Sequence, residues 1–301
     1  MSSSAANALL LDASLRWRDR PASADIRHLP KVNVPVLRAV RKALPVQGAH
    51  RTLAAAYATA LRLSQLARLL RQAKAESLEQ LRARPLEEAD ALAQKIAKQS
   101  GWLAASSGAA LGVAGLAGWV ADVPALLLLA LRTLVRIGYC YGEPPSAALV
   151  AALFALASAD TEDEKRLAWN AALSTPVADA EIATSIRDAA LRDGLERAVE
   201  REFAKQALNS SLQKLLTTLV QRLGLKKAAG ALPVLGAVVG GVVNLRFVHQ
   251  LGEAARMVFV ARRLLAEGMP SEALLFKAPT AVSASPPKTT RRRRPAPVPA
   301  P

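Results

Sequence analysis

The sequence predicts an all-α fold, a multi-helix bundle in which two tightly packed glycine-rich segments meet. Hydrophobic residues make up 51% of the 301 residues, but aromatic residues make up only 4%. The core must therefore be built from Ala, Leu and Val, and long Ala- and Leu-rich runs with few consecutive β-branched residues favour helix over strand. A chain of this length can bury a substantial core in one large or two small domains.

The first segment, residues 1–50, carries a weak structural signal. Pro30, Pro35 and Pro45 interrupt a short basic stretch, so we expect a weakly structured basic N-terminal segment. The N-terminus has no basic n-region, and its apolar run is too short for a secretory signal peptide. We therefore expect a cytoplasmic protein.

A helical domain is expected over residues 51–277. Its first helix, 51–74, mixes leucines with arginines that are imperfectly segregated around a helical projection, which argues against a membrane-surface helix. Thr161 and Glu164 have the spacing of a capping box for a helix that ends near Leu173. The other predicted helices cover residues 86–102, the glycine-rich block after them, 123–141, 146–158, 179–223 and, as two helices, 234–267. Residues 278–301, rich in Pro and Arg, predict a disordered tail.

Six glycines are predicted to pack helices against each other. In the first glycine-rich block, residues 108–118, the glycines follow at steps of four, three and three residues. In the second, residues 236–240, the two glycines are four residues apart, so each set lies on one helix face. Missing side chains on such a face let another helix backbone approach closely. The first block predicts a nearly uncharged helical hairpin. The six positions are Gly108, Gly112, Gly115, Gly118, Gly236 and Gly240.

Two uncharged stretches, 103–121 and 228–245, raise the question of membrane insertion. A spanning helix needs roughly 20 apolar residues, and the lengths are just sufficient. Both stretches are dominated by Ala and Gly, and the first runs directly into Asp122, whose cost at a helix centre is about 2.5 to 3.5 kcal/mol. A hairpin buried in a protein core is the favoured interpretation, with monotopic or re-entrant association and true spans left open.

A cluster of polar residues is the candidate anion- or lipid-binding site. Arg132 and Arg136 are four residues apart and therefore share a helix face, and two arginines together suit a phosphate. Structural alternatives stay open. Asp122 can cap a helix that starts near Pro124, Arg132 can be solvated or paired, and Asn244 can form a hydrogen bond between two helices. The candidate residues are Asp122, Arg132, Arg136, Asn244 and Arg246.

The residues point to no metal, cofactor or reaction. Cys140 is the single cysteine, and the three histidines follow no metal-ligand spacing. The glycine block lacks the Gly-Lys-Ser/Thr of a P-loop, and no G-x-S-x-G occurs. A non-catalytic protein is therefore favoured. The enzymatic alternative acts on a lipid-like substrate with Asp122 and Arg132 at its centre.

Positive charge is concentrated in two stretches that contain no acid. Residues 31–74 hold nine Lys or Arg and residues 278–301 hold five, within a formal net charge of +16. Such stretches attract an anionic membrane surface or nucleic acid. No base-reading motif accompanies them, so an anionic membrane or lipid is the favoured partner, and nucleic-acid binding would be nonspecific.

Two blocks of the chain resemble the EcsC protein family. Its members show a glycine-rich helix, a D-x-P, a leucine-rich helix ending in Arg and Tyr-Gly, and later a P-x-x-G-A-x-x-G-x-x-x-N element. The resemblance covers residues 86–267. After the Tyr-Gly pair the family commonly continues with an aromatic and an acid, but this chain has Glu143-Pro144-Pro145. The matching positions are Asp122, Pro124, Arg132, Ile137, Tyr141 and Gly142, then Pro233, Gly236, Gly240, Asn244, Phe247, Ala255 and Arg263-Leu264.

The resemblance implies a bacterial, membrane-linked protein without an assigned biochemical activity. The family is named after a gene beside an ABC transporter operon, which implies an accessory to a transporter or envelope process. We therefore expect peripheral association with the inner face of the membrane, and a membrane protein is a further expected partner.

Overall fold

A computed structural model describes residues 3–22, 57–113, 115–159, 161–176 and 233–276. The side-chain surroundings of residues 111–124 and 233–240 lie outside this description. All regular elements in the described ranges are helices, so the predicted all-α fold is confirmed for them. The predicted helix over 179–223 and the predicted tail over 278–301 lie outside the described residues.

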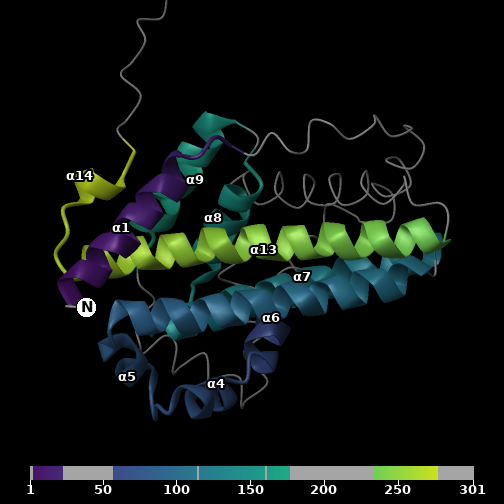
Figure 1. The fold of residues 1–301 in the computed structure, drawn as a ribbon, viewed down its shortest axis with the longest axis horizontal. Coiled ribbons are helices and arrows are strands. Elements are labelled where there is room, and N and C mark those ends of the chain that lie inside the picture. Colours follow the sequence, from purple (N-terminus) through teal and green to yellow (C-terminus); the bar gives the residue numbers. More distant parts are fainter. Residues whose placement is uncertain (1–2, 23–56, 114, 160, 177–232, 277–301) are drawn as a thin grey trace, which may run out of the picture.

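Three long helices form the centre of the fold, and shorter helices cover them on two sides (Figure 1). The shorter α1, α8 and α9 lie on one side of α13, and α4 and α5 lie beyond α6 (Figure 1). The elements are α1 (Ser3–Asp19), a helical stretch over 57–63, α4 (Leu66–Ala73), α5 (Leu78–Ala83), α6 (Leu86–Val113), α7 (Gly115–Cys140), α8 (Ala147–Ala157), α9 (Glu162–Ser174), α13 (Pro233–Ala266) and α14 (Ser271–Leu274).

The helices α6 and α13 pack closely along a seam of small residues. A Cβ atom added to Gly241 would lie 3.0 Å from the carbonyl oxygen of Ala105, and one added to Gly252 would lie 3.1 Å from the Cβ of Ala97. The two sequences run in opposite directions through these contacts, so the helices are antiparallel. Glycine at these positions therefore permits the close approach.

The predicted packing glycines are only partly tested by this seam. Gly108 is buried on α6. The surroundings of the other five predicted positions lie outside the described side chains, so their packing role stays a prediction. The seam uses Gly101, Gly241 and Gly252 instead, and a Cβ on Gly101 would lie 3.1 Å from Leu245 Cδ1.

Two helix starts follow the sequence closely. Ser146 caps α8, because its side chain accepts a hydrogen bond from the backbone N–H of Leu149 at 3.2 Å. Thr161 caps α9 by accepting from the backbone N–H of Glu164, also at 3.2 Å. The helices predicted over 146–158 and after Thr161 are therefore confirmed.

The expectation of weak structure at the N-terminus is wrong for residues 3–19, which form α1. The helix is held by tertiary contacts that a local pattern does not reveal. Ser14 Oγ donates to the carbonyl oxygen of Met257 at 3.1 Å, and Lys165 Nζ donates to the carbonyl oxygen of Trp17 at 3.1 Å. Lys165 thereby satisfies the carbonyl end of α1, where a cation is favoured.

Three helix boundaries also differ from prediction. The helix expected over 51–74 is interrupted at Gln65, which adopts a left-handed conformation with φ of 50°. The two helices expected in 234–267 are one continuous helix, α13, in which Gly241 and Gly252 pack against α6. The glycine-rich block divides between α6, which ends at Val113, and α7, which begins at Gly115.

Asp122 therefore does not cap a helix start. It lies inside α7, which continues through Pro124 to Cys140. Proline removes one backbone donor from a helix, but α7 continues through it. Within the described residues, no helix combines the length and apolar character needed to cross a bilayer.

Candidate anion-binding site

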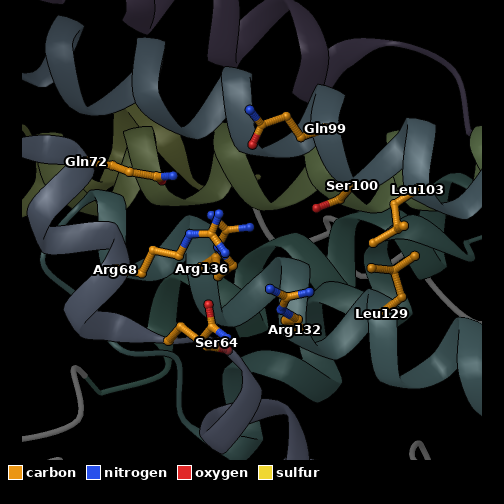
Figure 2. A pocket seen from close by; sticks show the side chains of 10 residues that line it. Ser64, Arg68, Gln72, Gln99, Ser100, Leu103, Leu129, Arg132 and Arg136 are labelled. Carbon is orange, nitrogen blue, oxygen red and sulfur yellow. The ribbon is translucent and has the colours of Figure 1, made fainter.

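A cavity of about 240 Å³ lies between α4, α6 and α7. Figure 2 shows Arg68 from α4, and Arg132 and Arg136 from α7, directed into the space beside α6. We call this cavity the arginine pocket. Its lining consists of Ser64, Gln65, Arg68, Gln72, Gln99, Ser100, Leu103, Leu129, Arg132 and Arg136.

Helical spacing explains how each element presents its residues to the arginine pocket. Arg132 and Arg136 are one turn apart on α7, and Arg68 and Gln72 are one turn apart on α4. On α6 the lining residues occupy adjacent positions of one face, with Ser100 buried and Leu103 at 50% exposure. Three helices thus each contribute one polar stripe.

The break at Gln65 gives α4 its direction. Its left-handed backbone ends the stretch 57–63 and starts α4, and Gln65 provides no side-chain cap. Leu69, fully buried, anchors α4 in the core. The N-terminus of α4 therefore borders the arginine pocket, and the partial positive charge of a helix N-terminus favours anions there.

The pocket lining contains three guanidinium groups and no carboxylate. Burial lowers the pKa of Arg136, and the neighbouring charges of Arg132 and Arg68 lower it further. The Nε atoms of Arg132 and Arg136 are buried and make no hydrogen bond within the described structure. Positive charge is therefore held at this site without compensation from the described residues.

The other polar side chains of the pocket are mostly exposed to solvent, as Arg68, Gln72 and Gln99 are. Among the residues that the structure describes, Arg68, Gln72, Gln99 and Ser100 use no side-chain atom in a hydrogen bond or ion pair. Ser64 differs, because its hydroxyl donates to the carbonyl oxygen of Ala60 at 2.5 Å. The lining therefore offers guanidinium, amide and hydroxyl donors, which is the set that binds phosphate oxygens.

The cysteine next to the pocket arginines is not an activated thiol. Cys140, one turn after Arg136, is buried, and its thiol donates to the carbonyl oxygen of Arg136 at 3.2 Å. Burial raises the pKa of the Cys140 thiol well above its ordinary value, which keeps the group protonated and unreactive. In the described parts of the chain, no group of His, Cys, Asp and Glu has the arrangement of a metal site.

A second polar cluster lies where α6, α7 and α13 meet near Tyr141, and here every charge has a partner. Asp90 accepts from Arg256 Nε at 3.0 Å and from Arg256 Nη2 at 2.7 Å. Tyr141 Oη donates to the same carboxylate at 2.8 Å. We call these three residues the Asp90 cluster.

The loop after α7 brings a second buried carboxylate to an arginine. Glu143 accepts from Arg262 Nε at 2.8 Å. Arg262 also donates to the carbonyl oxygens of Ala172 and Thr175, each at 2.7 Å. The Glu143-Pro144-Pro145 loop therefore carries an acid with a structural role.

A protein-family model described as the EcsC protein family matches residues 11–264. The chain belongs to the EcsC protein family. It is 28% identical over 190 residues to the uncharacterized protein YdbA of Bacillus subtilis (strain 168), a match that covers 63% of each chain. The chain thus spans less than two thirds of that relative's length. No solved structure matches the chain.

The Tyr-Gly pair of the EcsC resemblance has a clear structural place. Tyr141 belongs to the Asp90 cluster, and its ring stacks on Phe259 with centroids 5.5 Å apart. Gly142 has a φ of +68°, and a Cβ there would lie 2.6 Å from the carbonyl oxygen of Leu78. Glycine is required at position 142 because the backbone is left-handed there and because a side chain would overlap the Leu78 carbonyl oxygen. This part of the EcsC pattern stabilises the fold.

The arginine pocket contains two of the five residues predicted for the anion- or lipid-binding site, Arg132 and Arg136. Asn244 is fully buried on α13, and Arg246 is exposed on α13; neither lines the pocket. The side-chain placement of Asp122 lies outside the described structure. The structure therefore brings together the two arginines of α7 without the two residues of α13.

Sequence reasoning missed the residues that α4 and α6 contribute. Ser64, Arg68 and Gln72 recur at steps of four, a polar stripe that could have been recognised within 51–74. Nothing in the sequence connects this stripe to Arg136, because the two helices meet only through tertiary packing.

Proposed function

We propose that this EcsC chain is a non-catalytic, lipid-interacting protein that binds an anionic head group in the arginine pocket. One observation carries the proposal. Three arginines line the pocket without a carboxylate, and two of them bury Nε atoms that lack a hydrogen bond in the described structure. A bound anion would supply both the missing charge and the missing acceptors.

Physical chemistry favours such a ligand over a purely structural role. A buried charge is costly unless it is paired and hydrogen-bonded, and Arg132 and Arg68 add repulsion at Arg136. Charge-assisted hydrogen bonds from arginine to phosphate are short, strong and often bidentate. A phosphate group therefore fits this lining better than a neutral ligand.

Exposed basic side chains around the pocket support a position at a membrane surface. Arg62 and Arg71 are exposed near α4, and Lys95 and Lys98 are exposed on α6. Each basic residue near an anionic leaflet contributes about 1 kcal/mol of attraction. We propose peripheral association with the inner face of the membrane. An accessory role to a transporter or envelope process is part of the same proposal, and its support is the family resemblance rather than a feature of the pocket.

Titration with inorganic phosphate tests the pocket directly. We expect calorimetry to detect binding to the wild-type protein and Arg136→Gln to weaken it by about tenfold or more, as loss of one charge-assisted contact would. Arg71→Gln is the matched control, because Arg71 is an exposed arginine of α4 outside the lining. Equal binding by the wild type and Arg136→Gln would contradict the proposal.

Cell fractionation tests the membrane association separately. We expect the full-length protein to sediment with membranes and to be released by a high-salt wash, since screening weakens surface electrostatics. Retention through alkaline carbonate would instead indicate insertion into the bilayer. Recovery entirely in the soluble fraction would contradict a membrane role and leave a water-soluble anion as the ligand.

A further inference from the structure

We infer that the arginine pocket binds a phosphate monoester lipid that stays in the bilayer, with Trp102 at the membrane interface beside the pocket. This inference rests on the proposed function and specifies its ligand. It follows from the charge of the pocket, its size and the exposed apolar residues at its rim.

The charge of the pocket favours a monoester over a diester. Three guanidinium groups line it without a carboxylate. A phosphate monoester carries about −1.5 to −2 charges at pH 7 and presents three acceptor oxygens. A phosphodiester carries a single charge and keeps two free oxygens, so it would leave more of the positive charge uncompensated.

The size of the pocket admits a head group but not a whole lipid. Its volume of about 240 Å³ is below the range of roughly 300–1,000 Å³ that encloses drug-sized ligands. The rest of a larger ligand must therefore leave the pocket. Leu103 and Leu129 are the apolar members of the lining, so they mark the side along which a hydrocarbon chain would leave.

Trp102 extends this apolar side onto the surface of α6. It is 70% exposed and directly precedes Leu103, which is 50% exposed. It also lies four residues after exposed Lys98, so both project from the same face of the helix. Tryptophan with nearby lysine is typical of the membrane–water interface, where the ring sits at head-group level. The rim is therefore complementary to an anionic bilayer in both charge and polarity.

Two matched experiments separate the lipid inference from the proposed function. The first measures inorganic phosphate binding in solution to the wild type, Trp102→Ala and Arg136→Gln. The second measures flotation with phosphatidylcholine vesicles that contain phosphatidic acid, a monoester, or enough phosphatidylserine, a diester, to match the surface charge. Leu167→Ala is the control for loss of an exposed apolar side chain, because Leu167 is 71% exposed on α9 and does not line the pocket.

We expect Trp102→Ala to bind inorganic phosphate as the wild type does and to lose about tenfold in affinity for phosphatidic acid vesicles. Leu167→Ala should match the wild type in both assays, and Arg136→Gln should fail in both. Equal flotation with phosphatidic acid and phosphatidylserine, or full vesicle binding by Trp102→Ala, would overturn the lipid inference. Binding of inorganic phosphate to the wild type would still support the proposed function in that case. Absence of phosphate binding to the wild type would overturn both.

Discussion

Arg256 and Arg136 are both partly buried, but their surroundings differ in charge. Burial lowers the pKa of Arg256, yet hydrogen bonding to Asp90 and its charge outweigh burial, so the net shift is upward. For Arg136, burial lowers the pKa and the nearest charges are other arginines. The same residue type therefore stabilises the fold at the Asp90 cluster, whereas at the arginine pocket our proposal assigns it to ligand binding.

The largest expected effect comes from breaking the Asp90 cluster. Asp90→Asn leaves the Arg256 guanidinium buried without a carboxylate and should lower the free energy of unfolding by about 3–5 kcal/mol. Urea denaturation followed by circular dichroism measures the change. Glu88→Gln is the control, because Glu88 is exposed and its contact with Arg84 is 3.9 Å long. A decrease under 1 kcal/mol for Asp90→Asn would contradict the comparison, because Arg256 would then depend on its carboxylate no more than Arg136 does.

Raising the pH should give the next largest decrease in the free energy of unfolding. This decrease reports on tyrosine hydroxyl groups rather than on guanidinium groups, since arginine keeps its charge. Burial raises the pKa of Tyr139 on α7 from 10.0 to about 12. Its stabilising contribution is therefore complete below about pH 10 and is lost as pH rises through about 12, by at most about 2.7 kcal/mol.

The alkaline loss should be smaller in Tyr139→Phe than in the wild type. Burial also raises the pKa of the Tyr57, Cys140 and Tyr141 groups, so some alkaline loss remains in the variant. Thermal denaturation at stepped pH values measures the difference. If the stability of the two proteins depended on pH in the same way, burial would not raise the pKa of Tyr139, and the prediction would be wrong.

Glu143→Gln should lower the free energy of unfolding by less than Asp90→Asn does. Arg262 keeps its hydrogen bonds to the carbonyl oxygens of Ala172 and Thr175 when the charge of Glu143 is removed. We expect a decrease in the free energy of unfolding of about 1.5 kcal/mol, the scale of one hydrogen bond to a charged group. A loss as large as that of Asp90→Asn would show that the carbonyl oxygens do not compensate Arg262.

The smallest effect, with the opposite sign, is expected at the arginine pocket. Arg136→Met removes a half-buried like charge and should raise the free energy of unfolding in chloride buffer by up to about 1 kcal/mol. Phosphate at one hundred times its dissociation constant for the wild type should stabilise the wild type by about 2.7 kcal/mol and the tenfold weaker variant by about 1.4 kcal/mol or less. Destabilisation by Arg136→Met in chloride would assign Arg136 to the fold rather than to a ligand.

Much of the fold was predictable because strong local signals agree with the tertiary structure. Ser146 and Thr161 are effective caps, and they mark the helix starts correctly. The break at Gln65 was not predictable, because no glycine or proline marks it and glutamine rarely adopts a left-handed conformation. The continuity of α13 was not predictable, because the contact that Gly241 and Gly252 make with α6 is a tertiary feature.

The candidate site was predictable only along one helix. Arg132 and Arg136 follow from a spacing of four, which fixes a shared face wherever the helix lies. Arg68 joins them only after α4 has packed beside α7, and one sequence holds no signal for that contact. Asn244 and Arg246 were grouped with the arginines by charge and polarity, properties that do not report which helices are neighbours.

The antiparallel packing of α6 on α13 has a consequence for synthesis in the cell. α6 and α7 are complete at Cys140, but α13 ends at Ala266. At roughly 5–20 residues per second, the ribosome needs on the order of ten seconds to make the intervening chain. During that interval the small-residue face of α6 lacks the helix that covers it in the folded protein, so this face is completed only when α13 has been made.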